Sequence, residues 1–322
     1  MHTPLTLSRL PSPIEKLESC SNRLGVEIWV KRDDLTGFGL SGNKVRKLDF
    51  LLADAKAKQA DTVITCGGIQ SNHCRATVVA SRRLGLKSVV LLRGAPPENP
   101  DGNLLLMQML GASIQWVDST GYSNRDAIML EISHSLRSDG AVPYIIPEGG
   151  SNALGALGFV RAGKELSMQS LQLGIRFDSV VCAVGSGGTL AGLAMSGIAG
   201  DVVGVAVCDD RDTFRNRVQD IAIEAKEQGL SLSSSFDVME GFQGRGYALT
   251  TPAELECQMR MMRETGLFLD PVYTGKAWFA LEKTLIKDRK AFGDRVLFWH
   301  TGGTFGLFGR GHEYAPLLGS AG

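Results

Sequence analysis

The stretch TVITCGGIQSNHCRATVVASRRLGLKSVVLL, residues 62–92, carries the pattern that decides the fold. Residues 62–66 and 87–92 are short apolar runs rich in β-branched side chains, and residues 73–85 between them have the composition of a helix. A strand, a helix and a second strand in this order predict a βαβ unit with parallel strands. Because ligands bind beyond the carboxyl ends of such strands, the Gly- and Ser-rich loop after the first strand is a candidate site.

The same alternation continues on both sides of this unit. Apolar residues recur at positions 45, 48, 51, 52 and 55, which is a helical stripe. Further strands are expected at 27–31, 113–117, 142–146, 179–184, 202–207 and 296–300, and further helices at 103–111, 125–140, 155–170, 188–197, 213–229, 252–265 and 275–287. Two such series meet at the Gly-rich turn PEGGSN, residues 147–152. We therefore expect an α/β protein with two open twisted parallel-sheet domains and a cleft between them.

One more helix is expected to begin in the segment SPIEKL, residues 12–17. Ser12 can cap a helix, Pro13 fits its first position, and Glu15 completes a capping box. The segment therefore predicts a helix that precedes the strand at 27–31.

Length and charge narrow the classes of function. The chain has 322 residues, enough for two domains of ordinary size, and its 43% hydrophobic and 21% charged content is typical of globular proteins. Lys+Arg and Asp+Glu number 34 each, so neither nucleic acid nor an anionic membrane would meet a dominant basic face. The start, MHTPLTLSRL, shows no secretory signal, and no apolar run reaches the length of a membrane span. The expected location is the cytoplasm.

The cysteines and histidines do not predict a metal site. The six cysteines are scattered without a CxxC pair, which favours reduced thiols. Cys66 and Cys74 flank the loop after the strand at 62–66, so they are candidate neighbours of a site. The five histidines form no ligand-spaced pairs with the cysteines, and we expect no metal.

The segment VGSGGTLAGL, residues 184–193, is a candidate phosphate site. Small residues between a buried strand and a helix start expose backbone N–H groups, and the helix dipole favours an anion there. Ser186, Gly187, Gly188 and Thr189 would hold the phosphate. The dinucleotide pattern G-x-G-x-x-G is broken, because Leu190 takes the place of the third glycine, and the P-loop Gly-Lys pair is absent. A plain strand–helix turn remains the alternative.

The loop CGGIQSNHCR, residues 66–75, offers polar side chains at the start of a helix. Gln70, Ser71 and Asn72 can bind a carboxylate or a phenolic oxygen. The alternative for Ser71 is a helix cap, which is its commoner role. A histidine such as His73 is more often structural than a general base.

Lys44 follows Ser-Gly-Asn at the expected start of the helix whose stripe begins at residue 45. The helix dipole there disfavours the protonated amine and should lower the pKa of Lys44. An amine that is neutral near pH 7 can form a Schiff base and can later move protons. A solvated surface lysine is the alternative, and the neighbouring loops argue against it.

Together these loops resemble one family. The motifs KRDD, SGNKVRKL, GGIQSNHCR, PEGGSNALGALG, GSGGT, DPVYTGKA and HTGG occur in the same order as in the D-cysteine desulfhydrase/1-aminocyclopropane-1-carboxylate deaminase family. The resemblance covers about residues 10–310 and implies pyridoxal 5′-phosphate as cofactor and the fold of type II pyridoxal-phosphate enzymes, which is tryptophan-synthase-β-like. It implies a larger cofactor-binding domain of residues 1–44 and 155–322, a smaller α/β domain of residues 45–154, and a cofactor cleft between them.

The resemblance also implies roles for individual residues. Lys44 would hold the cofactor as an aldimine and act as a base, and Tyr273 would face the substrate across the ring. The substrate carboxylate would be bound by Gln70, Ser71, Asn72 and His73, with Asn72 also on the 3′-oxygen of the cofactor. The remaining cofactor contacts would come from Lys47, Gly185, Ser186, Gly187, Gly188, Thr189, Thr274 and Thr301.

Two positions separate the branches of the family. Deaminases of the cyclopropane acid resemble DPVYEGK, with a glutamate at the pyridine nitrogen, and tend to have leucine after the histidine of HTGG; this chain has Thr274 and Thr301 there. A hydroxyl at that nitrogen makes a weaker electron sink, which suits β-elimination, where the leaving group departs as the carbanion forms. The resemblance therefore favours D-cysteine as substrate, converted to pyruvate, sulfide and ammonia.

Several alternatives remain open at this stage. Within the family these are 1-aminocyclopropane-1-carboxylate deaminase, giving 2-oxobutyrate, and L-cysteate sulfo-lyase. Outside it, a nucleotide-binding oxidoreductase is disfavoured by the broken glycine pattern, and a non-enzymatic cofactor sensor by the presence of all the site residues. The runs TFGLF (304–308) and GFQGRGYALTT (241–251) depart from the family pattern. A homodimer is expected because the family commonly forms one.

Overall fold

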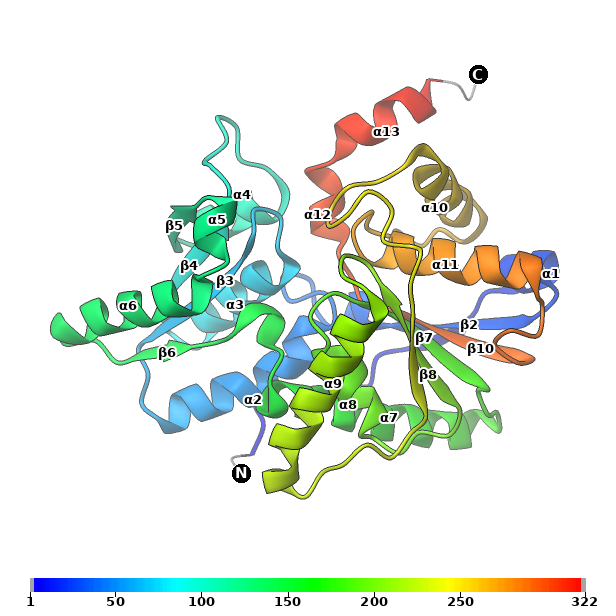
Figure 1. Ribbon diagram of the computed structural model, residues 1–322, viewed down its shortest axis with the longest axis horizontal. Coiled ribbons are helices and arrows are strands. Elements are labelled where there is room, and N and C mark those ends of the chain that lie inside the picture. Colours follow the sequence, from blue (N-terminus) through cyan, green and yellow to red (C-terminus); the bar gives the residue numbers. More distant parts are fainter. Residues whose placement is uncertain (1–2, 320–322) are drawn as a thin grey trace.

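The computed structural model describes residues 3–319 and contains two sheets (Figure 1). The larger sheet has the strand order β1-β2-β10-β7-β8-β9, and the smaller has the order β5-β4-β3-β6. All pairings are parallel except β1 with β2. The strands are β1 (Ile14–Lys16), β2 (Glu27–Arg32), β3 (Thr62–Gly68), β4 (Lys87–Arg93), β5 (Ser113–Val117), β6 (Pro143–Ile145), β7 (Ser179–Val184), β8 (Asp201–Ala206), β9 (Phe236–Met239) and β10 (Arg295–His300).

Helices cover both faces of each sheet, so the strands of both sheets are largely buried (Figure 1). The α-helices are α1 (Glu18–Leu24), α2 (Lys44–Ala57), α3 (Asn72–Arg83), α4 (Gly102–Met109), α5 (Ser119–Tyr122), α6 (Arg125–Ser138), α7 (Ala153–Leu173), α8 (Gly188–Ala194), α9 (Arg211–Ala225), α10 (Pro252–Thr265), α11 (Thr274–Lys287), α12 (Thr304–Phe308) and α13 (Gly311–Leu318). Three short 3₁₀ turns, η1 (Asp33–Leu35), η2 (Glu148–Gly150) and η3 (Lys226–Gln228), complete the described elements. No helix within residues 3–319 is long and apolar enough to cross a membrane.

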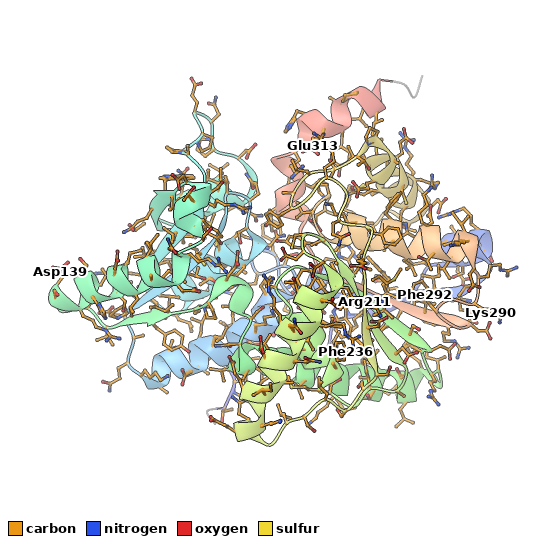
Figure 2. The ribbon with its side chains drawn as sticks, viewed as in Figure 1. Asp139, Arg211, Phe236, Lys290, Phe292 and Glu313 are labelled. Atoms are coloured by element: carbon orange, nitrogen blue, oxygen red, sulfur yellow. The ribbon has the colours of Figure 1, made fainter. Side chains whose placement is uncertain are left out.

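The two sheets lie side by side along the long axis of the molecule. Asp139, just beyond α6 of the smaller sheet, and Lys290, shortly before β10 of the larger, mark opposite ends of that axis (Figure 2). The α/β class with two parallel-sheet bodies is confirmed. Every strand of the smaller sheet lies within residues 45–154, as the expected domains require, but the boundary itself stays a prediction because α2 packs against both α3 and α7.

The helix expected at residues 12–17 is wrong. Ile14–Lys16 form β1, which pairs antiparallel with β2, and the helix begins only at Glu18. Ser12 caps nothing: its hydroxyl donates to Asp33 and its backbone N–H to Glu165. Edge pairing and buried polar contacts therefore override the local capping pattern, as tertiary structure commonly does with short-range signals.

A buried ionic network fixes how α2 sits on the larger sheet. Arg46 binds both oxygens of Asp33 at 2.7 and 2.8 Å and both oxygens of Glu165 at 3.0 Å. Lys31 lies 2.6 Å from Glu165, and the indole of Trp299 donates to Asp33. The network thus joins α2, η1 and α7 to strands β2 and β10. These partners hold the pKa values of Asp33 and Glu165 below their usual range against the opposing effect of burial.

The first prediction concerns this network. Replacing Arg46→Met would leave the buried carboxylates of Asp33 and Glu165 short of a partner, and we expect the free energy of unfolding to fall by about 3–5 kcal/mol. Urea unfolding followed by circular dichroism measures it. The exposed Arg161→Met in α7 is the control and should change little. A loss below about 1 kcal/mol in Arg46→Met would mean that the network does not stabilise the fold.

Candidate active site

One cavity of about 330 Å³ lies at the carboxyl ends of strands from both sheets. Its wall combines the β3–α3 loop, the end of β4, α5 and the turn η2 with the β7–α8 loop and the loops after β8 and β10. Ten of the residues predicted for the site line it: Lys44, Ser71, Asn72, His73, Gly185, Ser186, Gly187, Thr189, Tyr273 and Thr301. Loops from distant parts of the sequence thus meet where the fold places a ligand.

Lys44 is the first residue of α2, as the sequence analysis predicted, and its side chain faces the cavity. Its Nζ lies 3.4 Å from the carbonyl oxygen of Gly149. The surrounding protein desolvates the ammonium group and lowers the pKa of Lys44 to about 8, while the carboxylate of Glu148 acts in the opposite direction. The predicted direction is confirmed, but burial rather than the helix terminus is the main cause.

Lys47 lies just behind the cavity wall, where the sequence analysis expected a phosphate contact. Its buried Nζ donates to the carbonyl oxygen of Gly149 and to the hydroxyl of Ser151, both at 3.0 Å. Among residues 3–319 no carboxylate pairs with it, and burial together with Lys44 lowers its pKa well below the usual value. A buried cation without a carboxylate partner is costly unless an anion binds there.

The loop after β7 completes an anion cradle with Lys47. The hydroxyls of Ser186 and Ser151 are 2.8 Å apart, and Asn43 donates to the hydroxyl of Thr189 at 3.0 Å. A Cβ atom at Gly188 would lie only 2.8 Å from Nζ of Lys47, so a larger residue would fill the cradle. The cation, the hydroxyls and the open backbone therefore fit a phosphate group.

Two tyrosines form the wall beside this cradle. Tyr273 packs so closely on Gly185 that a Cβ there would come within 2.9 Å of its ring. Its hydroxyl lies 2.9 Å from that of Tyr247, which the sequence analysis missed because the loop 241–251 looked unlike the family pattern. Burial raises the pKa of Tyr247 to about 12 and that of Tyr273 well above its usual value. Both phenols are therefore neutral at physiological pH and can donate hydrogen bonds.

The β3–α3 loop supplies the opposite wall. Ser71 caps α3, since its hydroxyl accepts from the backbone N–H of Cys74 at 3.2 Å. The helix cap given as its alternative role is therefore present, and Ser71 also lines the cavity. Asn72 lines the cavity too, and its side-chain oxygen accepts from Asn103 at 2.9 Å. A hydrogen bond of 2.8 Å joins Nε2 of His73 to Thr65, and burial lowers the pKa of His73 far enough to keep it neutral.

Gln70 and Thr274 do not line the cavity. The amide of Gln70 turns to α4, where it donates to Asp101 and accepts from the backbone N–H of Asn103. Thr274 is fully buried and donates to a carboxylate oxygen of Asp270 at 2.7 Å. Of the two threonines that separate the branches of the family, only Thr301 faces the cavity.

The cavity wall also contains charged residues for which the sequence analysis predicted no role. Glu148 lies in the quoted motif PEGGSN, where it accepts from the hydroxyl of Tyr122 at 2.7 Å and pairs with Arg125 at 3.4 Å. Arg217 pairs with Asp209 at 3.2 Å. Their positions depend on which loops meet in space, and no local pattern indicates that. Among the described residues no group of three or more His, Cys, Asp or Glu is arranged to hold a metal ion.

Comparisons with known proteins show which family the chain belongs to. The family model described as pyridoxal-phosphate dependent enzyme matches residues 5–302. The chain is 41% identical to the bifunctional D-cysteine desulfhydrase/1-aminocyclopropane-1-carboxylate deaminase, mitochondrial, of Arabidopsis thaliana, over 99% of this chain and 82% of that protein. A relative from Thermotoga maritima, named for 1-aminocyclopropane-1-carboxylate deaminase, is 44% identical over 94% of this chain and 97% of its own.

Comparison with solved structures indicates the same family and fold. The crystal structure of a homologue of 1-aminocyclopropane-1-carboxylate deaminase has a TM-score of 0.90 at 36% identity and covers 98% of this chain and 97% of its own. A fungal L-serine ammonia-lyase from Rhizomucor miehei, at 17% identity and a TM-score of 0.70, shares the fold over 96% of this chain and 98% of its own. The resemblance, the type II fold and the cofactor predicted from the sequence are thereby confirmed. The chain belongs to the D-cysteine desulfhydrase/1-aminocyclopropane-1-carboxylate deaminase family of pyridoxal-phosphate dependent enzymes.

Proposed function

We propose that this enzyme is a lyase that eliminates the β-substituent of a small amino acid, with D-cysteine as the preferred substrate. The overall reaction takes D-cysteine and water to pyruvate, sulfide and ammonia. One observation carries the proposal: the amine of Lys44, with its pKa lowered to about 8, shares a cavity with Tyr273, the Lys47 cradle and the loop around Ser71. The name of the relative from Arabidopsis thaliana includes D-cysteine desulfhydrase and supports this substrate.

The residues present fit the cofactor. Lys47, Ser186, Thr189 and the backbone at Gly187 would hold its phosphate, and Tyr273 would lie against its ring. When bound, pyridoxal phosphate supplies an electron-poor ring that stabilises negative charge at the α-carbon of the substrate. Lys44 is close enough to the cradle to anchor the cofactor as well as to handle a proton, since its Nζ is near the same Gly149 carbonyl that accepts from Lys47.

The chain's own residues then direct the elimination. Ser71, Asn72 and the N–H groups at the start of α3 would bind the substrate carboxylate. Lys44 removes the proton from the α-carbon, and the electron pair of the breaking Cβ–S bond leaves with the sulfur. The hydroxyls of Tyr273 and Tyr247, which lie 2.9 Å apart, would return a proton to the leaving group.

The preference for elimination over ring opening rests on Thr301 as the group that would face the pyridine nitrogen of the bound cofactor. Thr301 presents a hydroxyl to the cavity. The nearby carboxylate of Asp270 is already saturated, because it accepts from the backbone N–H groups of Val272, Tyr273 and Thr274 and from the hydroxyl of Thr274. A hydroxyl at that position would leave the ring nitrogen largely unprotonated, which suits a reaction whose leaving group departs readily.

A homodimer and a cytoplasmic location are part of this proposal. All six cysteines are unpaired thiols, which fits the reducing cytoplasm. The homodimer rests on the family resemblance. The mitochondrial location in the name of the plant relative is a property of that protein.

The second prediction addresses Lys44. Replacing Lys44→Ala should lower keto-acid formation by at least about 10³-fold, because the variant lacks both the anchoring amine and the base. It should also abolish the visible absorbance of protein-bound pyridoxal phosphate. Lys56→Ala, an exposed lysine of the same helix, is the control and should retain both. An active, yellow Lys44→Ala protein would contradict the assignment.

The third prediction concerns pH. Only the neutral amine of Lys44 can capture the aldehyde of pyridoxal phosphate, so the capture rate of the cofactor-free protein should rise with pH and reach half its maximum near the pKa of about 8. Stopped-flow absorbance measures it. A rate that keeps rising through pH 10 would mean that burial does not lower this pKa.

The fourth prediction discriminates between substrates. The cofactor-loaded enzyme is offered D-cysteine, L-cysteine, L-cysteate and 1-aminocyclopropane-1-carboxylate in parallel, and the keto acids are identified by chromatography. We expect pyruvate and sulfide from D-cysteine. Predominant 2-oxobutyrate from the cyclopropane acid would make the deaminase the main activity and refute the argument from Thr301.

A further inference from the structure

Arg93 is the last residue of β4 and lines the cavity beside the β3–α3 loop. Its register partner on β3 is Gly68, the last residue before this loop. The side chain is half-buried. Arg93 therefore stands on the substrate side of the cavity, on the strand next to the one that leads to Ser71.

Two aromatic rings hold the guanidinium of Arg93 in place. It lies 5.3 Å from the ring centre of Tyr122 and 5.3 Å from that of Tyr247. Tyr122 is the last residue of α5, which follows β5 of the smaller sheet, and Tyr247 lies in the loop after β9 of the larger sheet. Such contacts fix the plane of a guanidinium but leave its N–H groups free to bind an anion at the edge.

The charges of the cavity wall are otherwise paired. Arg125 pairs with Glu148, and Arg217 pairs with Asp209. Within residues 3–319 no carboxylate lies within ion-pair distance of Arg93, and its guanidinium contacts the two rings. Lys44 and Lys47 serve the cofactor under the proposed function. Arg93 is thus a cation of the wall that still lacks an anion.

The position of Arg93 indicates which anion. The phosphate has its cradle on the larger sheet, and the α-carboxylate has the hydroxyl of Ser71 and the N–H groups at the start of α3. The group of the substrate that remains is its β-substituent. We propose that Arg93 binds this β-substituent and selects substrates in which it is an acidic sulfur group, a sulfonate or a thiolate. The inference rests on the proposed function and names its substrate class.

The chemistry of elimination fits this role. As the Cβ–S bond breaks, the sulfur group takes the electron pair. A sulfonate leaves as sulfite, and a thiolate leaves as hydrosulfide after taking a proton from the hydroxyl pair of Tyr273 and Tyr247. Lys44 takes the α-proton, and one water completes the release of pyruvate and ammonia. A guanidinium beside a thiol favours its thiolate form, and it binds a sulfonate through two parallel hydrogen bonds. 1-Aminocyclopropane-1-carboxylate has no such group and gains nothing from Arg93.

The first test measures binding and does not depend on turnover. 3-Sulfopropanoate and propanoate share a carboxylate and differ by one sulfonate, and calorimetry gives their affinities for the cofactor-loaded protein. We expect 3-sulfopropanoate to bind more tightly, and Arg93→Gln to weaken it by about 10- to 100-fold while propanoate changes little. Arg93→Lys, which keeps the charge, should recover part of the loss. The exposed Arg137→Gln is the control.

Equal affinities of the two ligands for the wild-type protein, or an equal loss for both in Arg93→Gln, would overturn the inference. The equal loss would assign Arg93 to the α-carboxylate.

Kinetic measurements distinguish a failure of the role of Arg93 from a failure of the proposed elimination reaction. β-Chloroalanine eliminates chloride and carries no acidic sulfur, so Arg93→Gln should lower its kcat/KM by at most about 3-fold while that of cysteate or D-cysteine falls by 10-fold or more. Pyruvate formation from none of these substrates by the wild-type enzyme would refute elimination, whereas the two affinities would still decide the role of Arg93.

Discussion

The pairing of Arg46 with Asp33 and Glu165 is the interaction on which the rest of the site depends. Arg46 lies between Lys44 and Lys47 in the sequence, and its side chain binds Asp33 and Glu165 in the interface with α7 instead of lining the cavity. Residues three apart in a helix share a face, so fixing Arg46 fixes the rotation of α2 and turns both lysines toward the cavity. Replacing all members of a buried ionic network by apolar residues often costs little stability, whereas removing one member is costly, so the network tolerates few alternative arrangements. Here it sets the orientation of the helix that carries Lys44 and Lys47.

Much of the fold could be predicted from the sequence because parallel strands covered on both faces are continuous apolar runs. The bounds of β5, β7 and α10 were predicted as the structure has them. Predictions from local sequence patterns were wrong where a tertiary contact determines the secondary structure. Ser12 and Pro13 resemble a helix start, but pairing with β2 makes the following residues a strand.

The same division applies to the site. Lys44, Ser71 and Tyr273 stand in motifs whose order along the chain is specific, so the sequence was enough to nominate them. Tyr247 and Arg93 enter the cavity only because the loop after β9 meets the end of β4 across the two sheets, and such a meeting leaves no short-range signal. The cause of the lowered pKa of Lys44 was likewise hidden, since burial depends on the assembled cavity.

The close contact of α2 with α7 limits how such an enzyme can be redesigned. A Cβ atom at Gly158 would lie 2.3 Å from the carbonyl oxygen of Arg46, so the two helices touch backbone to backbone. Because this contact is made by backbone atoms, no side chain between Gly158 and Arg46 can be altered to shift Lys44 by a small amount. Attempts to engineer a new substrate range should therefore leave α2 alone and vary the smaller sheet, where loop residues can change without moving Lys44.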